Sequence, residues 1–242
     1  MTNIYGATIL SQVGSPVGVF YGYKTDGVYA TTAEANADGY YIVSSNGARK
    51  YFKAGDIRFV NSGADKEINA SDRTMIGDPN PEYFGNIFTN LSYKKLTLNV
   101  VFNYSVGNDV FNYQRSVLES GSRFFNQTTA LTNRWTTEGQ ETSIPKINYE
   151  DVMGNARFSD RWIEDGSYLR LKALTLSYSL PVNNTYIKGY TVWGSVTNLI
   201  TWTKYLGSDP EVSLGNSALA QGIDRGLLAQ GRSFTLGLKI NL

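Results

Sequence analysis

The chain has 242 residues, a formal net charge of +1 at neutral pH, and neither histidine nor cysteine. The balanced charge, without any lysine- or arginine-rich run, predicts no binding to nucleic acid. Without histidine and cysteine the chain can form no disulfide, no thiolate metal site and no histidine-based catalytic triad. The 17 tyrosines, 11 phenylalanines and 24 glycines indicate an all-β fold rich in aromatic residues.

The first part of the chain gives mixed signals. Thr2–Leu10 is a strand candidate, and Val17–Tyr29 is aromatic and β-branched with a turn signal at Asp26-Gly27. Thr31–Ala37 could form a short helix, whereas Asp38–Gly77 is typical of a loop. No apolar run has the length of a transmembrane helix, and no signal peptide is visible at the start of the chain. If the protein is exported, we expect its true N-terminus elsewhere.

Glu82–Ser105 predicts a β-hairpin with a two-residue turn at Lys94-Lys95. Side chains on a strand alternate between two faces, so this turn fixes an apolar face and a face of amides and hydroxyls. The predicted register pairs Tyr93 with Leu96, Leu91 with Leu98, Thr89 with Val100, Ile87 with Phe102, Ser92 with Thr97, Asn90 with Asn99 and Asn86 with Asn103.

Three more alternating segments follow after a long polar interval, Val106–Asp165, which holds one plausible helix around Val110–Ser120. A short turn at Asn183-Asn184 joins the first two segments, and the polar stretch Thr201–Gln230 precedes the last. The segments are Ser167–Pro181, with Tyr168, Leu174, Leu176, Tyr178 and Leu180 on one face; Gly189–Leu199; and Arg232–Leu242, with Phe234, Leu236, Leu238, Ile240 and Leu242 on one face.

The connections between these strands alternate between very short ones and ones of about 60 and about 30 residues, which exceed ordinary loop lengths. Outer-membrane barrels show this asymmetry, with tight periplasmic turns, long extracellular loops and strands of roughly 10 residues. Alternation alone leaves a soluble or surface β-sandwich that binds carbohydrate or another ligand as the alternative. Aromatic residues at the strand ends (Tyr93, Tyr104, Tyr178) favour the membrane.

In a barrel, one face of each strand meets the polar lumen and the other face meets lipid. The lumen-facing candidates are Asn86, Asn90, Asn99 and Asn103. The lipid-facing candidates are Leu91, Leu98, Val100, Phe102, Leu174, Leu176, Phe234, Leu236, Leu238 and Ile240.

Six stretches, which cover nearly the whole chain, resemble in this order the C-terminal part of SusC/RagA-type TonB-linked outer-membrane proteins. They are Gly14–Tyr29, Ala54–Asn61, Asp72–Asn112, Ser159–Pro181, Thr197–Val212 and Gly231–Leu242.

The resemblance implies TonB-dependent uptake of oligosaccharides or peptides across the outer membrane of a Gram-negative bacterium. It also implies, for the complete protein, a 22-stranded barrel with an N-terminal plug, driven by the TonB system and capped by a SusD-like surface lipoprotein.

About six or seven strands are visible, whereas a barrel that holds a plug needs about 22. Lipid does not tolerate open sheet edges. We therefore expect residues 1–242 to be the C-terminal segment of a receptor barrel, without plug or signal peptide. Its strands should be antiparallel and arranged up and down, with long extracellular loops. The chain is then a fragment of a longer protein, or one part of a split protein whose barrel another polypeptide completes.

Asn61–Asp72 lies where the family often has a loop that looks like a calcium site, with Asn61, Asp65 and Asp72 as candidate ligands. Ca²⁺ needs several oxygen ligands and a glycine at the sixth position. Here Lys66 replaces that glycine, and Gly63 offers no side-chain oxygen. A plain extracellular loop is favoured over a Ca²⁺ site, and no other cofactor is predicted.

Trp193, Trp202 and Tyr205 are candidates for stacking on sugar rings, although strand-end aromatics also form interface girdles. Asp160, Glu164 and Asp165 could act as paired carboxylates of a hydrolase. No partner base is evident, so a solvated loop is favoured and we expect no enzymatic activity.

Overall fold

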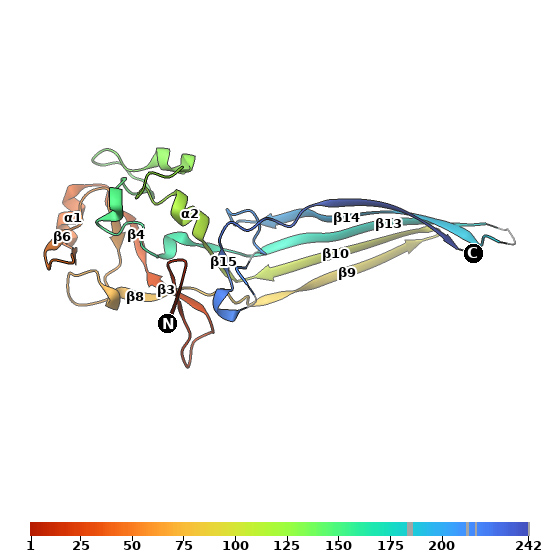
Figure 1. Cartoon of the computed structure of the whole chain (residues 1–242), viewed down its shortest axis with the longest axis horizontal. Coiled ribbons are helices and arrows are strands. Elements are labelled where there is room, and N and C mark those ends of the chain that lie inside the picture. The colour runs from red at the N-terminus through yellow and green to blue at the C-terminus, as the bar shows by residue number, and fades with distance from the viewer. Residues whose placement is uncertain (183–185, 212, 216, 242) are drawn as a thin grey trace. The chain divides into compact units, whose positions relative to one another are not determined.

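The computed structural model describes residues 1–182, 186–211, 213–215 and 217–241, and they fold into two compact units (Figure 1). The loop unit comprises Met1–Asn80, Asp109–Glu164 and Ser213–Gly226. The sheet unit comprises Pro81–Asn108, Asp165–Val212 and Leu227–Leu242. The first 80 residues and large parts of the two long polar connections thus form a unit of their own.

The sheet unit is one antiparallel sheet of five strands in the order β16-β14-β13-β10-β9. Consecutive long strands of the chain are neighbours, which is the up-and-down arrangement that the sequence predicts. Asn183, Asn184 and Leu242, which belong to a predicted turn and strand end, lie outside the described residues. The strands are β9 (Tyr83–Tyr93), β10 (Leu96–Val106), β13 (Tyr168–Pro181), β14 (Gly189–Thr203) and β16 (Ser233–Asn241).

The hairpin of β9 and β10 has the predicted register in every pair. Its two-residue turn places Lys94 at φ 55°, the left-handed region that non-glycine residues seldom adopt. The pairs Leu91–Leu98 and Asn90–Asn99 lie on opposite faces, as alternation requires. The prediction of this hairpin is confirmed.

A β-bulge in β13 changes the face assignment of one predicted residue. Val101 pairs with Ala173 but Phe102 pairs with Leu171, so Lys172 is an extra residue on β13. Beyond this bulge the odd-numbered residues of β13 share the apolar face. The prediction that Tyr168 lies on the same face as Leu174 was therefore wrong.

The apolar face of this sheet has no second sheet packed against it in the described part of the chain. Leu236 is 88% exposed, and none of the described buried hydrophobic residues belongs to the five strands. A β-sandwich would bury this face against a partner sheet about 10 Å away. The sandwich alternative is therefore contradicted.

The loop unit holds two buried hydrophobic clusters, one around Tyr29 and Phe59 and the other around Phe20 and Trp162. Its strands are β1 (Thr2–Ile4), β2 (Ala7–Leu10), β3 (Val19–Tyr23), β4 (Thr25–Val28), β5 (Tyr41–Val43), β6 (Arg49–Tyr51), β7 (Ile57–Phe59), β8 (Arg73–Gly77), β11 (Asp109–Asn112) and β15 (Ile223–Asp224). Another short strand, β12, spans Ile163–Asp165.

The helices of the loop unit are short. Helix α1 (Thr32–Asp38) confirms the predicted helix, and Thr31 and Glu34 form a capping box at its start. Helix α2 spans Tyr113–Leu118, and the 3₁₀ turns are η1 (Ala70–Asp72), η2 (Thr129–Asn133), η3 (Tyr149–Asp151), η4 (Asp160–Trp162) and η5 (Ala218–Ala220). Among the described residues, no helix combines the length and apolarity needed to cross a membrane.

The prediction that Asp38–Gly77 is a loop was wrong in part, because it contains β5, β6, β7 and β8. Each of these strands has three to five residues. Segments this short do not complete a recognisable alternation.

Candidate functional site

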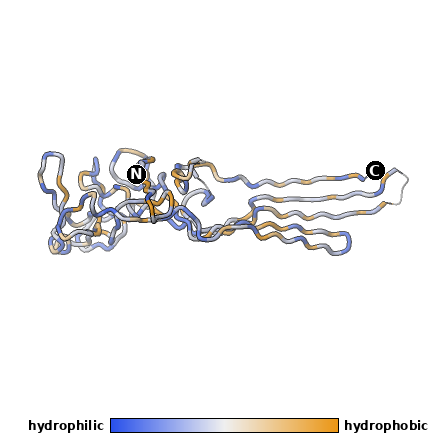
Figure 2. Tube along the Cα trace, turned by 90° about the horizontal axis from the view of Figure 1, so that it is seen from below, coloured by the Kyte–Doolittle hydropathy of each residue, from blue (hydrophilic) through white to orange (hydrophobic). Residues whose placement is uncertain are grey.

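The two faces of the five-stranded sheet form the candidate functional surface. All ten predicted lipid-facing residues lie on one face, because the register joins them in rows across the strands. Apolar and polar residues alternate along these strands (Figure 2). The assignment of the apolar face to lipid stays a prediction. The main rows are Val100–Leu174–Val196–Phe234, Leu91–Leu98–Leu176–Gly194–Leu236 and Leu96–Tyr178–Val192–Leu238.

Two aromatic rows border the apolar face. Tyr93 and Tyr178 both pair with Leu96 near the short turns, whereas Tyr104 and Trp202 both pair with Leu169 near the long connections. Leu96 and Tyr104 are eight residues apart on β10, which corresponds to about 26 Å along the strand. At a tilt of about 40° the rows would lie about 20 Å apart along the membrane normal, close to the band of about 25 Å between the aromatic girdles of known barrels.

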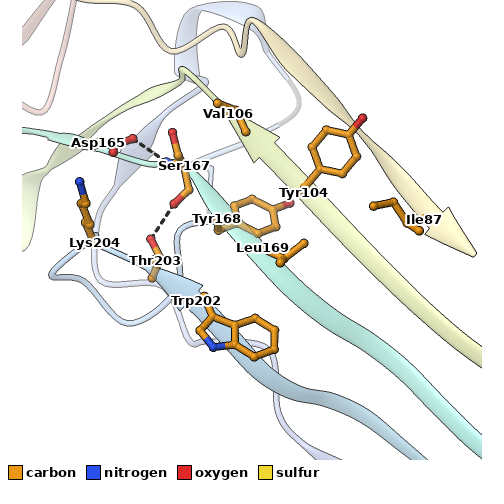
Figure 3. Close-up of a pocket in the computed structure, with 10 residues that line it drawn as sticks. All are labelled: Ile87, Tyr104, Val106, Asp165, Ser167, Tyr168, Leu169, Trp202, Thr203 and Lys204. Carbon is orange, nitrogen blue, oxygen red and sulfur yellow. Dashed lines mark hydrogen bonds between the residues drawn. The ribbon is translucent and has the colours of Figure 1, made fainter.

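The row of Tyr104, Leu169 and Trp202 borders a hollow of about 610 Å³ (Figure 3). The hollow is lined mainly by apolar and aromatic residues, and the charged residues Asp165 and Lys204 also border it. Ser167 N donates to Asp165 Oδ1 over 2.9 Å, and hydrogen bonds from Ser167 lower the pKa of the Asp165 carboxyl. Aromatic rings beside charged groups are typical of the boundary between lipid and water.

The opposite face holds a buried ion-pair network centred on Arg170 of β13. This residue is only 2% exposed, and its guanidinium pairs with both Asp209 and Glu211. The Arg170 Nη1–Glu211 Oε2 distance is 2.8 Å, and Arg170 Nε donates to Thr201 Oγ1 over 2.9 Å. Carboxylates from a segment about 40 residues further along the chain thus neutralise Arg170, which lies on the amide-bearing face of the sheet.

Asp209 holds this network together. Burial would raise the pKa of Asp209, but hydrogen bonds from Arg170 and from the backbone N–H groups of Gln230 and Glu211 lower it below its usual value. Asp209 and Glu211 belong to the sequence stretch Asp209–Val212, of which Val212 lies outside the described residues. Aspartate and proline are ordinary turn residues, but the structure gives the carboxylates of this stretch an ionic role.

The predicted lumen-facing amides all share the face of Arg170. Asn86 pairs with Asn103, and both line a hollow of about 380 Å³ together with Phe84, Tyr168 and Glu211. Asn90 and Asn99 form the next amide pair along the hairpin. The sequence did not predict Tyr168 at this hollow, because the bulge at Lys172 reverses the face on which Tyr168 lies. It did not predict Glu211 either, because this residue is distant in sequence from the hairpin.

The three predicted stacking residues do not form one site. Trp193 lies on the amide-bearing face, where it pairs with Ser177, whereas Trp202 lies on the apolar face. Tyr205 is buried, and its ring lies against Gly207. The position of Trp202 in an aromatic row favours its alternative interpretation as an interface residue.

The arrangement of the loop Asn61–Asp72 does not fit Ca²⁺ coordination. Asp72 uses both carboxylate oxygens to accept backbone N–H groups, from Ser62 and Asn69, over 2.8 Å each. Asp65 Oδ1 accepts the backbone N–H of Glu67. Lys66 Nζ donates to the carbonyl oxygen of Asp38 over 2.7 Å. The candidate oxygens of Asp65 and Asp72 therefore serve the fold of the loop.

Comparisons with known proteins identify relatives of this chain, although no protein-family model matches it. It is 32% identical to TonB-dependent receptor P3 of Formosa agariphila (strain DSM 15362), over 96% of this chain and 23% of that protein. It is 31% identical to TonB-dependent receptor P26 of the same organism, over 94% of this chain and 23% of the relative. The chain thus spans about a quarter of the length of the curated relatives it matches.

Solved structures show the same fold. The RagAB peptide transporter matches with a TM-score of 0.72 and 25% identity, over 99% of this chain and 24% of that one. The RagAB peptide importer in its closed-closed state matches with a TM-score of 0.71 and 24% identity, over 99% of this chain and 24% of that one. By sequence and by fold, the chain belongs to the TonB-dependent receptors of the SusC/RagA type and corresponds to part of their barrel.

Proposed function

We propose that this chain forms part of the wall and the outer loops of an outer-membrane importer that takes up oligosaccharides or peptides in a TonB-dependent manner. The observation that carries the proposal is the uncovered apolar face between two aromatic rows, backed by amides and an ion-pair network. Such a sheet has lipid on one side and a polar lumen on the other. The fold shared with the RagAB peptide transporter supports this role.

The lengths of the connections indicate which end of the sheet faces the periplasm and which faces the cell exterior. In outer-membrane barrels the tight turns are periplasmic and the long loops are extracellular. Lys94-Lys95 would then lie at the periplasmic rim, and the long connections, which contribute to the loop unit, would meet substrate first. A SusD-like lipoprotein would be the partner on that side, and the TonB system of a Gram-negative cell would supply the energy.

We infer a transport role and no catalytic one, because the acidic residues near Trp162 serve the fold. Asp160 accepts hydrogen bonds from the backbone N–H and the hydroxyl of Thr25. Glu164 accepts from Arg115 over 2.8 Å, and Asp165 accepts from the backbone N–H of Ser167.

Uptake by cells tests this proposal. Cells with and without the gene should be given fluorescently labelled oligosaccharides and peptides, with and without a protonophore. We expect uptake that needs both the gene and the proton gradient, and recovery of the protein, with a surface lipoprotein, in the outer-membrane fraction. Recovery in the soluble fraction, or uptake unaffected by gene deletion, would contradict the proposal.

A further inference from the structure

A hollow of about 510 Å³ in the loop unit is surrounded by positive charge. Arg49 and Lys50 come from β6, Lys53 from the turn after it, and Lys146 from a segment far along the chain. Among the described residues, Asp56 is the one carboxylate that lines this hollow. Because the chain as a whole carries a net charge of only +1, the local excess of cations is a specific feature of this site.

Asp56 is already satisfied within the fold. It is 1% exposed, and its oxygens accept the backbone N–H of Lys53 and the side-chain amide of Asn155, each over 2.9 Å. Lys146 Nζ lies 3.1 Å from Asp56 Oδ2 and donates to the carbonyl oxygen of Ala54. Asp56 and Lys146 therefore neutralise each other, and this carboxylate has little capacity left for the other cations.

Arg49, Lys50 and Lys53 form no ion pair with any residue in the described part of the chain. The guanidinium carbon of Arg49 lies 4.7 Å from the centre of the Tyr41 ring, which fixes its position without neutralising it. Three positive charges thus border one hollow, and none of them has an ion-pair partner among the described residues. Like charges held close together repel one another, so an anionic ligand would relieve this repulsion.

An exposed aromatic surface adjoins these cations. Tyr51 also lines the hollow and is 52% exposed, and its ring lies 5.6 Å from that of Tyr41, its partner across β5 and β6. Tyr51 therefore presents part of its ring to solvent at the hollow. An exposed aromatic ring beside cationic side chains suits a ligand whose own ring carries acidic groups.

We propose that this hollow binds an anionic oligosaccharide through its carboxylate or sulfate groups. Lys50 and Lys53 bind the acidic groups by charge-assisted hydrogen bonds, and Tyr51 contacts the apolar face of a sugar ring. An acidic peptide shares the negative charge but gains less from the aromatic face. The inference rests on the proposed function only in taking this ligand to be the transported substrate.

Binding to the purified full chain in detergent tests the site, with isothermal titration calorimetry as the readout. The probes are a galacturonic acid pentamer, its fully methyl-esterified form and pentaglutamate. We expect the acidic pentamer to bind and the neutral form not to. Raising the ionic strength from about 0.01 M to about 0.15 M should weaken binding, since it shortens the Debye length from about 30 Å to about 8 Å.

The double variant K50Q/K53Q should bind the acidic pentamer about tenfold more weakly or worse, because two charge-assisted contacts are lost. The matched control is K94Q/K95Q, which removes the same charge from the hairpin turn and should leave affinity unchanged. Equal binding by K50Q/K53Q, by the neutral pentamer or by pentaglutamate would overturn the inference. Both variants should retain the wild-type unfolding midpoint, which separates loss of binding from loss of fold.

Uptake separates this inference from the proposed function. If both hold, K50Q/K53Q cells import less of the acidic saccharide while import of neutral substrates is unchanged. If wild-type cells show no energy-dependent uptake but the acidic pentamer still binds, the transport proposal fails and the binding site stands. If uptake is present but K50Q/K53Q imports the acidic saccharide normally, the site is not a substrate site.

Discussion

Trp193 of β14 lies directly across the polar face from Gly237 of β16, and the two residues pair in the sheet. A Cβ atom built on Gly237 would come within 2.2 Å of the indole ring. The indole of Trp193 therefore occupies the space that a side chain at position 237 would need. Large aromatic residues beside a strand glycine recur in sheets, where the ring covers the exposed backbone.

Substituting Gly237 by alanine should destabilise the sheet by about 1–3 kcal/mol, the usual cost of overpacking. The measurement is the urea-unfolding midpoint of the full chain in detergent. The control is Gly231→Ala, because a Cβ there meets nothing within 4 Å. Equal midpoints for the two variants would show that the indole moves aside without cost.

Substituting Arg170 by methionine should cost about 3–5 kcal/mol, because it leaves the buried carboxylate of Asp209 without its cation. The control is Lys172→Met on the same strand. Its side chain is 32% exposed, and its ammonium lies 3.7 Å from Glu211, so its loss should cost under about 1 kcal/mol. Unfolding free energies in detergent test both values, and a larger loss for the Lys172 variant would contradict this account of the network.

Acid should weaken the same network. The folded state lowers the pKa of Asp209 below its ordinary value of 3.8, so its stabilisation is complete above that value and is lost as the pH falls through the folded pKa. We expect the stability difference between wild type and Asp209→Asn to be largest above about pH 5 and to shrink in stronger acid. Unfolding titrations of both proteins check this, and a difference that grows on acidification would refute it.

Arginine substitutions on adjacent residues of β16 should distinguish the two faces. Leu236→Arg places a charge on the apolar face and should cost about 2–4 kcal/mol for insertion into a bilayer. Thr235→Arg places the same charge on the other face and should be tolerated. The fraction that folds into liposomes, measured by heat-modifiable gel mobility, tests this pair. Equal yields would contradict the assignment of lipid to the apolar face.

The sequence was sufficient to predict the hairpin of β9 and β10, because both strands alternate without interruption and the turn Lys94-Lys95 leaves one register. It was not sufficient for β13, because the extra residue Lys172 puts Tyr168 on the opposite face from the predicted one. Nothing local marks that bulge. In the neighbouring strand β14, next to the bulge, Asn198 has φ 51°. Asparagine tolerates this left-handed conformation, but an asparagine in the sequence does not by itself predict it.

The loop unit was the largest failure of prediction. Its cores are assembled from residues far apart in sequence, such as Phe20 with Trp162 and Ile223. Periodicity within a window cannot detect such contacts, and strands of three residues show no period. The ion pairs of Arg170 with Asp209 and Glu211 escaped for the same reason, since no local pattern announces a partner about 40 residues away.

Single cysteines test the central claim, that the apolar face meets lipid, most directly, since the chain has no native cysteine. Leu98→Cys, Asn99→Cys, Val100→Cys and Val101→Cys would each carry a spin label in the protein reconstituted in liposomes. Accessibility to oxygen and to a water-soluble nickel chelate is then measured. We predict a period of two, with oxygen favoured at positions 98 and 100 and the chelate at 99 and 101. Uniform accessibility to the chelate at all four positions would contradict the account.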